Sequence, residues 1–275
     1  MCRLYGFISS HPRKVECELI RSQNSLMAQS HRDTEGHRNP DGWGLGAYKR
    51  SVPYVVKQVE TAAESEDYRW TASETMADRV ISHIRRATVG NISRENTHPF
   101  VHDDLMLAHN GHIEHFDKVR ERLLGELTSE EATWIEGTTD SEHILALVHH
   151  HVNGAEALPL REALVTSLQQ IIAWCHEVSA DKAPALNVIV SNGIEMVASR
   201  YHRSLHYTVR DAIHACEVCS QHPQHFKDAL RAHYAAVAIA SEPITNNEVW
   251  QAVPNKSVLR VGPDLEVELE EGCLG

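Results

Sequence analysis

The stretch "MCRLYGF" (residues 1–7) places a cysteine directly in front of an apolar run with the character of a buried β-strand. Two interpretations are open. Cys2 is either a small hydrophobic residue of that strand, or it becomes the first residue of the mature chain once Met1 is removed. In the second case a thiol and a free α-amine belong to the same residue. The rest of the sequence decides between the two.

Further strand-like segments follow through the first third of the chain, and others come after a helical middle. The pair Asn192-Gly193 separates two of them and is a strong signal for a hairpin with a type I′ turn. Helical patterns occupy residues 18–30, a segment capped by Thr139 or Asp140, and residues 159–177. We expect strands at residues 2–9, 42–49, 52–59, 80–88, 104–110, 185–191, 194–201, 204–210 and 235–241.

The order of these elements indicates the fold class. Strands, then helices, then strands, with hairpin connections, are typical of antiparallel sheets covered by helices. We therefore expect an α+β protein with one domain over residues 1–275. Residues 211–234 form a polar insertion rich in histidine and cysteine within it.

Composition excludes several classes of protein. The formal net charge of −12 comes without any basic run, which argues against binding to nucleic acid. No apolar run approaches the ~20 residues that span a bilayer, and no charged-then-apolar leader opens the chain. We expect no membrane contact and a cytoplasmic protein. Six cysteines in 275 residues are too few for a disulfide scaffold.

Five short motifs are more specific than a hydrophobic core requires: Cys2-Arg3, "NPDGWGLG" (39–46), "SHIRRAT" (82–88), "NTHPF" with "AHNG" (96–100 and 108–111), and "GTTDSEH" (137–143). In this order they resemble the glutaminase domain of the class II glutamine amidotransferases, which are N-terminal-nucleophile hydrolases. The resemblance spans residues 2–150 and continues more weakly to about residue 262. It implies a four-layer αββα sandwich of two antiparallel sheets between helix layers, and no cofactor.

The resemblance makes Cys2 the nucleophile. A thiol with a pKa near ~8.5 is partly ionised at neutral pH, and an α-amine with a pKa near ~8 can take its proton. Nucleophile and base then share one residue, so Met1 must be removed. The small side chain at position 2 permits that removal.

Asn110 and Gly111 match the family's oxyanion hole. Acyl transfer builds negative charge on the carbonyl oxygen, and a side-chain amide together with a backbone N–H can stabilise it. The pair also fits a type I′ turn after an apolar strand. Both interpretations can hold together.

Arg85 and Asp140 match the residues that bind the amino-acid end of the substrate. A bidentate guanidinium suits an α-carboxylate, and a carboxylate suits an α-ammonium group. Asp140 also fits a helix N-cap. Strand alternation would send Arg85 and Arg86 to opposite faces, so at most one of them serves the pocket. The same motif makes Thr88 a further substrate contact.

Three more residues belong to the motifs with less definite roles. His98 supports the site rather than transferring protons. Trp43 and Gly44 either line the pocket or hold the Cys2 strand, and core packing explains Trp43 equally well. Val89 departs from the family pattern, because large synthases usually have histidine there, so one pocket contact is in doubt.

One segment lies outside these motifs. "IHACEVCSQHPQH" (213–225) contains a Cys-x-x-Cys pair with nearby histidines, the ligand types that zinc prefers. A structural zinc ion, a redox or regulatory dithiol, and an ordinary surface insertion remain open. The candidate ligands are His214, Cys216, Cys219 and His222.

The leading hypothesis is hydrolysis of the side-chain amide of glutamine, or of a γ-glutamyl compound, through a thioester on Cys2. "DGWG" and "SEP" resemble small stand-alone members, similar to the ergothioneine-pathway γ-glutamyl hydrolases. One alternative is a glutaminase subunit that delivers ammonia to a separate synthase partner. Another is a non-catalytic metal-binding or regulatory protein with the same fold.

Overall fold

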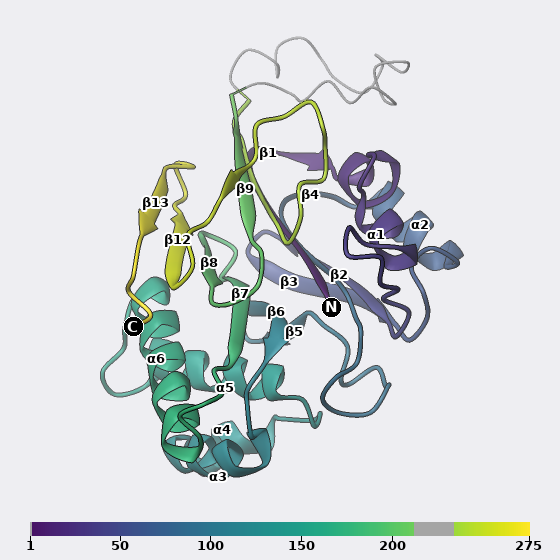
Figure 1. Cartoon of the computed structure of the whole chain (residues 1–275). Helices are drawn as coiled ribbons and strands as arrows, with labels where there is room; N and C mark the ends of the chain where they lie inside the picture. The colour runs from purple at the N-terminus through teal and green to yellow at the C-terminus, as the bar shows by residue number, and fades with distance from the viewer. Residues whose placement is uncertain (1, 212–233) are drawn as a thin grey trace.

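Two antiparallel β-sheets form the centre of the computed structural model, which describes residues 2–211 and 234–275 (Figure 1). The first sheet has the strand order β11-β9-β10-β1-β4-β2-β3, and the second has the order β13-β12-β8-β7-β6-β5. The strands, in chain order, are β1 Arg3–Lys14, β2 Trp43–Lys49, β3 Val52–Gln58, β4 Met76–Ile84, β5 Phe100–His102, β6 Leu105–His112, β7 Ala185–Ser191, β8 Met196–Arg200, β9 His206–Arg210, β10 Ala236–Ala240, β11 Gln251–Ala252, β12 Ser257–Val261 and β13 Val267–Glu270.

Strand β1 lies inside the first sheet because both of its faces are apolar. Side chains alternate along a strand, so Tyr5 and Phe7 point to one face and Leu4 and Ile8 to the other. The first pair packs in a core beneath helices, and the second packs between the two sheets. The strand pairs with β10 on one side and β4 on the other.

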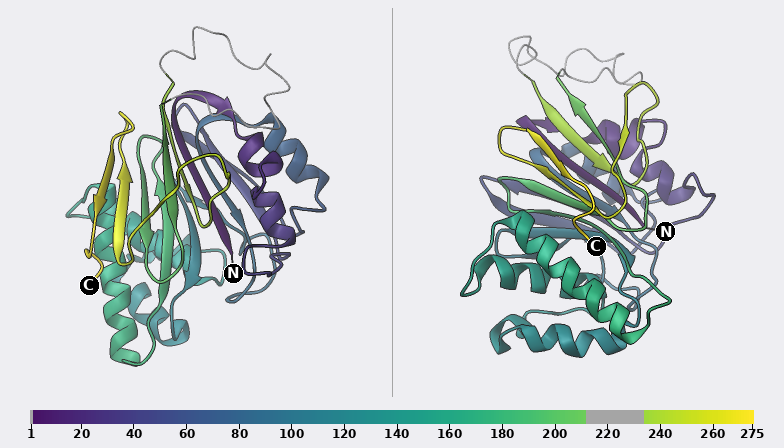
Figure 2. Two further views of the ribbon diagram at one scale, coloured as in Figure 1. Left: turned by 45° about the horizontal axis from the view of Figure 1, so that its top comes forward. Right: turned by 60° about the vertical axis from the view of Figure 1, so that its left-hand side comes forward.

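Helices cover the outer face of each sheet, which gives four layers (Figure 2). In the described part of the chain, two α-helices and a short π-helix cover the first sheet, and four α-helices lie on the side of the second. In chain order they are η1 Cys17–Arg21, α1 Leu26–His31, α2 Glu66–Glu74, α3 Phe116–Glu126, α4 Ser129–Thr133, α5 Asp140–Asn153 and α6 Leu160–Val178. The α+β class and the layered pair of antiparallel sheets are as expected. Among the described residues, no helix is long and apolar enough to cross a membrane.

Helix α5 begins where its sequence indicates. The Thr139 side chain caps it by accepting a hydrogen bond from the Glu142 backbone N–H at 3.4 Å. Asp140 is therefore the first residue of the helix and not its cap. The carboxylate is left at the positive end of the helix dipole.

The single helix expected at residues 18–30 is wrong, because the segment forms two separate helices. Residues Cys17–Arg21 form η1, Ser22 is extended, and a separate helix starts at Leu26. The Ser25 hydroxyl accepts a hydrogen bond from the Ala28 N–H at 3.3 Å, so it caps the second helix. A serine side chain can bond to the backbone and so interrupt a helix. The spacing of apolar residues alone does not predict this interruption.

The hairpin at Asn192-Gly193 is confirmed, but its turn is not the expected two-residue type I′. Ser191 pairs with Met196, which leaves a four-residue loop. Only Gly193 of the central pair has a positive φ, +78°. The Asn192 carboxamide oxygen accepts hydrogen bonds from the N–H groups of Ile194 and Glu195 at 3.1 and 3.0 Å, so its side chain closes the loop.

Candidate active site

Cys2 lies immediately before β1, half-buried, against the segment that follows β4. Its Sγ accepts a hydrogen bond from the Arg86 N–H at 3.2 Å and donates one to the Arg86 carbonyl oxygen at 3.2 Å. Burial raises the pKa of the Cys2 thiol above its ordinary value. The thiol is therefore fixed in position but is less acidic than a thiol in water.

Buried ion pairs hold the backbone beside Cys2. The Arg3 guanidinium contacts Asp33 Oδ2 at 2.7 Å and Glu242 Oε1 at 2.6 Å, and it donates to the Cys2 carbonyl oxygen at 3.0 Å. All of these charged side chains are buried. The sequence analysis gave Arg3 no role, because its partners lie 30 and 239 positions away along the chain.

A narrow cavity of about 20 Å³ opens beside the thiol, with room for about one water molecule. It brings together six of the nine residues expected at the site: Cys2, Arg85, Thr88, His98, Gly111 and Asp140. Its other lining residues are Arg86, Ala87, Val89, His109, Thr139 and Ser141.

Arg85 follows the last residue of β4, so the alternation argument about Arg85 and Arg86 does not apply and both line the cavity. One Arg85 amino group, Nη2, donates to the carbonyl oxygens of Val89 and Asn91 at 3.2 and 3.1 Å. The other, Nη1, is buried and has no hydrogen-bond partner among the described residues. A buried, unpaired donor is costly, and a ligand carboxylate would satisfy it.

Asp140 faces the same cavity from the first turn of α5. Its Oδ2 accepts a hydrogen bond from the Ile113 N–H at 2.7 Å, and its Oδ1 accepts one from the Ser141 hydroxyl at 3.1 Å. Strand β6 and the start of α5 are thereby tied together. Both oxygens keep free lone pairs, so the carboxylate can still accept from a ligand ammonium group.

Asn110 and Gly111 lie inside β6, opposite Asn187 and Leu186 of β7, so they do not form a turn. The Asn110 Nδ2 donates to Ser241 Oγ at 3.3 Å, and that oxygen also accepts from the Leu4 N–H at 2.9 Å. Asn110 is buried next to the cavity lining and linked to the Cys2 strand. At position 111 a Cβ atom would lie 1.8 Å from the Ala185 carbonyl oxygen, so only glycine fits.

Trp43 and Gly44 lie outside the cavity lining. Trp43 is fully buried in the core beneath the helices, edge-on to Tyr68 with ring centroids 5.1 Å apart. This position favours the core-packing interpretation of Trp43. At position 44 a Cβ atom would lie 1.9 Å from the His98 carbonyl oxygen. Gly44 thus allows the segment that carries His98 to approach the first sheet.

Comparisons with known proteins decide the family. The family model for the class II glutamine amidotransferases matches residues 1–267. The chain belongs to this family. It is thus an enzyme of the type that acts on the amide of glutamine or of γ-glutamyl compounds.

Two relatives and one solved structure illustrate the range of this amidotransferase family. The chain is 28% identical to "Probable glutamine amidotransferase DUG3" of Saccharomyces cerevisiae, over 95% of this chain and 82% of that protein. It is 23% identical to the γ-glutamyl-hercynylcysteine sulfoxide hydrolase of Mycobacterium tuberculosis, over 95% and 93%. The glutamine phosphoribosylpyrophosphate amidotransferase of Bacillus subtilis shares its fold, with a TM-score of 0.63 and 16% identity, over 98% of this chain and 48% of that one.

The amidotransferase has a pair of buried histidines at its cavity, and one of them, His98, belongs to the lining. The ring centroids of His83 and His98 lie 4.1 Å apart. Among the described residues, none of the four ring nitrogens makes a hydrogen bond of ordinary geometry. Burial, with the charge of Arg85 as a smaller cause, lowers the pKa of His83 to about 3. Burial and the neighbouring His83 lower the pKa of His98 as well. Both rings are therefore neutral at physiological pH, consistent with a supporting role for His98.

This pair predicts a pH dependence of stability. The pKa of His83 is about 3 when folded and near ~6.5 when unfolded, so protons bind preferentially to the unfolded chain. The free energy of unfolding is then unaffected by His83 above pH 6.5 and falls below it, by about 1.4 kcal/mol per pH unit for this group. We expect His83→Phe to remove that part of the fall. Urea unfolding of both proteins from about pH 7.5 to about pH 5 measures it, and equal slopes would contradict the assignment.

His109 is a cavity residue to which the sequence analysis gave no role, although it stands in the "AHNG" motif. Its Nε2 bonds to the Ala185 carbonyl oxygen at 2.9 Å, and its Nδ1 bonds to Ser141 Oγ at 2.9 Å. The carbonyl can only accept, so Nε2 carries a proton. The ring therefore orients Ser141, which itself contacts Asp140.

A larger hollow of about 750 Å³ lies next to the narrow cavity and shares Val89 with it. Its lining is mixed in charge, with Glu114 and Asp117 opposed to Arg120. The remaining lining residues are Thr138, His112, Ile113, His115 and Phe116. The candidate zinc ligands His214, Cys216, Cys219 and His222 lie outside the described residues.

Proposed function

We propose that this amidotransferase hydrolyses the side-chain amide of a γ-glutamyl compound through a thioester on Cys2. The observation that carries the proposal is the convergence of the Cys2 thiol, the unpaired Arg85 Nη1 and the Asp140 carboxylate on one cavity. These groups match a nucleophile, a carboxylate-binding cation and an ammonium-binding anion. The three groups match both ends of a γ-glutamyl moiety.

The first step joins Cys2 to the substrate. With Met1 removed, the Cys2 α-amine takes the thiol proton, and Sγ attacks the amide carbon. Because burial raises the pKa of the thiol, it does not ionise unaided at neutral pH, and an adjacent base is needed. The α-amine is on the same residue, so it reaches the thiol without another side chain.

The next steps collapse and hydrolyse the intermediate. Asn110 Nδ2 and the Gly111 N–H donate to the oxyanion, and the α-ammonium group returns its proton to the leaving nitrogen. Ammonia or an amine departs and leaves a γ-glutamyl thioester on Sγ. Water, deprotonated by the same α-amine, then attacks the thioester and frees glutamate. No cofactor takes part in these steps.

The hollow beside Val89 supports a substrate larger than glutamine. Val89 lines both the cavity and the hollow, so a leaving group that extends from Cys2 past Val89 would enter a space of about 750 Å³. The relative from Mycobacterium tuberculosis, by its name, hydrolyses a γ-glutamyl compound of this larger kind. The charged side chains in its lining, Glu114, Asp117 and Arg120, suit a leaving amine that carries charges of both signs, such as an amino acid or a peptide.

A glutaminase subunit that supplies ammonia to a separate synthase is the second candidate. It is favoured by the Bacillus subtilis enzyme, in which the matching fold is only 48% of the chain. In that case glutamine alone would be the substrate, and turnover would depend on the partner. The hollow would then face the partner rather than a leaving group.

Glutamate release by the isolated, tag-free chain tests the proposal, with Cys2→Ala as the control and with loss of Met1 checked by intact mass. We expect Cys2-dependent release from γ-glutamyl dipeptides, with kcat/KM at least about tenfold above that for L-glutamine. Equal kcat/KM values for the dipeptides and for L-glutamine would show that the hollow does not bind the leaving group. No release from either, with Met1 absent, would favour the partner-dependent candidate.

A further inference from the structure

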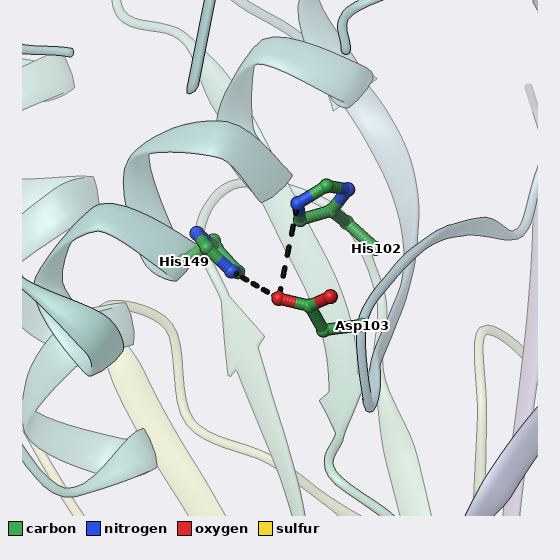
Figure 3. Close-up of side chains that lie close together, drawn as sticks. All are labelled: His102, Asp103 and His149. Carbon is green, nitrogen blue, oxygen red and sulfur yellow. Dashed lines mark hydrogen bonds and ion pairs between the residues drawn. The ribbon is translucent and has the colours of Figure 1, made fainter. Parts of the chain in front are cut away.

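A compact group of side chains lies where the β5–β6 turn meets α5 (Figure 3). His102 ends β5, Asp103 lies in the turn, and His149 projects from α5. Asp103 Oδ2 is 2.9 Å from His149 Nε2 and 3.9 Å from His102 Nε2. The three potential ligand atoms all lie within 4.8 Å of one another. Two imidazoles and one carboxylate at this spacing match the donor set of a transition-metal site.

Neighbouring residues hold both rings in place. The indole of Trp134 stacks on His102, with ring centroids 3.8 Å apart and planes 10° from parallel. His149 is only 8% exposed, and its second nitrogen, Nδ1, is buried without a hydrogen bond among the described residues. That nitrogen faces Glu131 Oε1 at 4.0 Å. A carboxylate behind a ligating histidine is the arrangement that orients imidazoles toward metals.

Glu131 is itself fixed. Its Oε2 accepts a hydrogen bond from the Thr128 N–H at 2.7 Å in the capping box of α4. The same oxygen lies 2.9 Å from His150 Nδ1. His149 Nδ1 lies 4.0 Å from Glu131 Oε1, which is too long for a hydrogen bond. Because the carboxylate is held, the imidazole of His149 would have to move to form one.

We propose that His102 Nε2, Asp103 Oδ2 and His149 Nε2 bind a divalent transition-metal ion of the zinc class, with water completing the coordination. Asp103 lies on the exposed side of the cluster, which gives a metal ion a path from solvent. Glu131 supports His149 from behind as an outer-shell carboxylate. None of these three ligands belongs to the cysteine- and histidine-rich segment 213–225.

A second cluster, Asp33, Glu35 and His37, has similar ligand types but a different electrostatic situation. Arg3 contacts Asp33 Oδ2 at 2.7 Å, and Asp33 Oδ1 accepts hydrogen bonds from two backbone N–H groups. Its carboxylate is therefore already neutralised. Within residues 2–211 and 234–275, the Asp103 carboxylate contacts only the neighbouring His102 and His149, and both of these can be neutral ligands.

The position of the site indicates a structural role. His149 lies nine residues after Asp140, about 13.5 Å along the helix at about 1.5 Å per residue, so a metal ion there does not touch the substrate. The ion would join the β5–β6 turn to α5. Strand β6, which follows the turn, carries Asn110 and Gly111 near its far end, and α5 carries Asp140 at its start. We expect metal binding to raise the melting temperature and to leave kcat unchanged.

Cobalt(II) titration of the full tag-free chain tests the site, followed by competition with zinc. A Cys17→Ser/Cys216→Ser/Cys219→Ser background removes the sulfur atoms of segment 213–225 and of Cys17, which is disulfide-bonded, as competing ligands for the probe. We expect one equivalent of cobalt to bind with visible d–d bands and no thiolate charge-transfer band, and to quench Trp134 fluorescence. If cobalt binding is lost entirely in this background, the ion was held by the cysteines and the proposal is wrong.

Asp103→Asn and Asp104→Asn form a matched pair for this titration. Both remove one exposed carboxylate, but only Asp103 belongs to the cluster. Asp103 has a φ of 51°, a conformation that asparagine tolerates well, so the variant should fold. We expect Asp103→Asn to weaken cobalt binding at least tenfold and Asp104→Asn to leave it unchanged. Equal affinities for the two variants would overturn the site.

Glu131→Gln tests the outer shell. Glutamine still satisfies the capping box of α4, so the helix start is preserved. Loss of the charge behind His149 should weaken metal binding by about tenfold. His102→Gln provides an independent ligand variant and should weaken it at least as much. Unchanged binding in both variants would contradict the assigned ligands.

Discussion

Cys2→Ala is expected to abolish glutamate release, and Cys2→Ser to lower kcat on the order of 10³-fold or more, while both variants remain folded. The reason for the second loss is protonation. A serine hydroxyl stays almost wholly protonated at neutral pH, and an α-amine is only a modest base. A serine oxygen can still occupy the place of Sγ between the Arg86 N–H and carbonyl oxygen. The geometry is therefore kept while the nucleophile is weakened.

Cys273→Ser is the matched control for this pair. Cys273 is a free, half-buried thiol near the C-terminus, and it is not among the residues that line the cavity. Its substitution should leave kcat and KM unchanged. Initial rates with a γ-glutamyl dipeptide, together with urea unfolding of each variant, separate lost chemistry from lost folding. A Cys2→Ser variant with wild-type rates would refute a thiolate nucleophile.

The same experiment can be extended to the base. A chain that retains residues in front of Cys2, such as an uncleaved tag, has an amide in place of the α-amine. We expect such a protein to fold and to lack turnover. Full activity with the extension in place would mean that another group accepts the thiol proton.

The sequence could predict the fold because its strongest signals are local. The apolar runs of β1, β6, β7 and β10 predict strands, and Thr139 predicts the start of α5. Antiparallel pairing follows from the hairpin connections. The sequence patterns give the wrong local structure where a side chain takes over backbone hydrogen bonds. Ser25 interrupts a continuous helical pattern because it caps a new helix, and Asn192 closes a four-residue loop where a two-residue turn was expected.

The site was predictable where its residues belong to motifs, and only there. Motif residues at the ends of β4 and β6 and at the start of α5 meet in one cavity. Arg3 was missed because its ion pairs with Asp33 and Glu242 join distant segments. His83 stands in the "SHIRRAT" motif, but nothing in the sequence shows that its ring is buried. The proposed metal ligands His102 and His149 were missed for the same reason as Arg3, since they lie 47 positions apart.

Asn110→Ala is expected to lower kcat by about 10²–10³-fold, about 2.7–4 kcal/mol in activation free energy, with little change in KM. The carboxamide is proposed to act on the oxyanion, which exists only in the transition state and the tetrahedral intermediate. Arg85 and Asp140 are proposed to bind the amino-acid end of the substrate, and their hydrogen bonds involve groups other than the Asn110 side chain. Binding of the ground state should therefore persist.

Two further variants distinguish an oxyanion role from a structural one. Asn110→Asp keeps the shape but places an acceptor, charged at neutral pH, where negative charge develops, so it should be at least as inactive as the alanine variant. Ser241→Ala removes the oxygen to which Asn110 Nδ2 now donates at 3.3 Å, so it loosens the carboxamide without deleting it. We expect that variant to lose about tenfold at most. Ser241 Oγ also accepts a hydrogen bond from the Leu4 N–H. Ser241→Ala should therefore lower the free energy of unfolding by more than it raises the activation free energy. If Asn110→Ala retained kcat within about fivefold of the wild type, the Gly111 N–H and the N-terminal residue would have to stabilise the oxyanion without it.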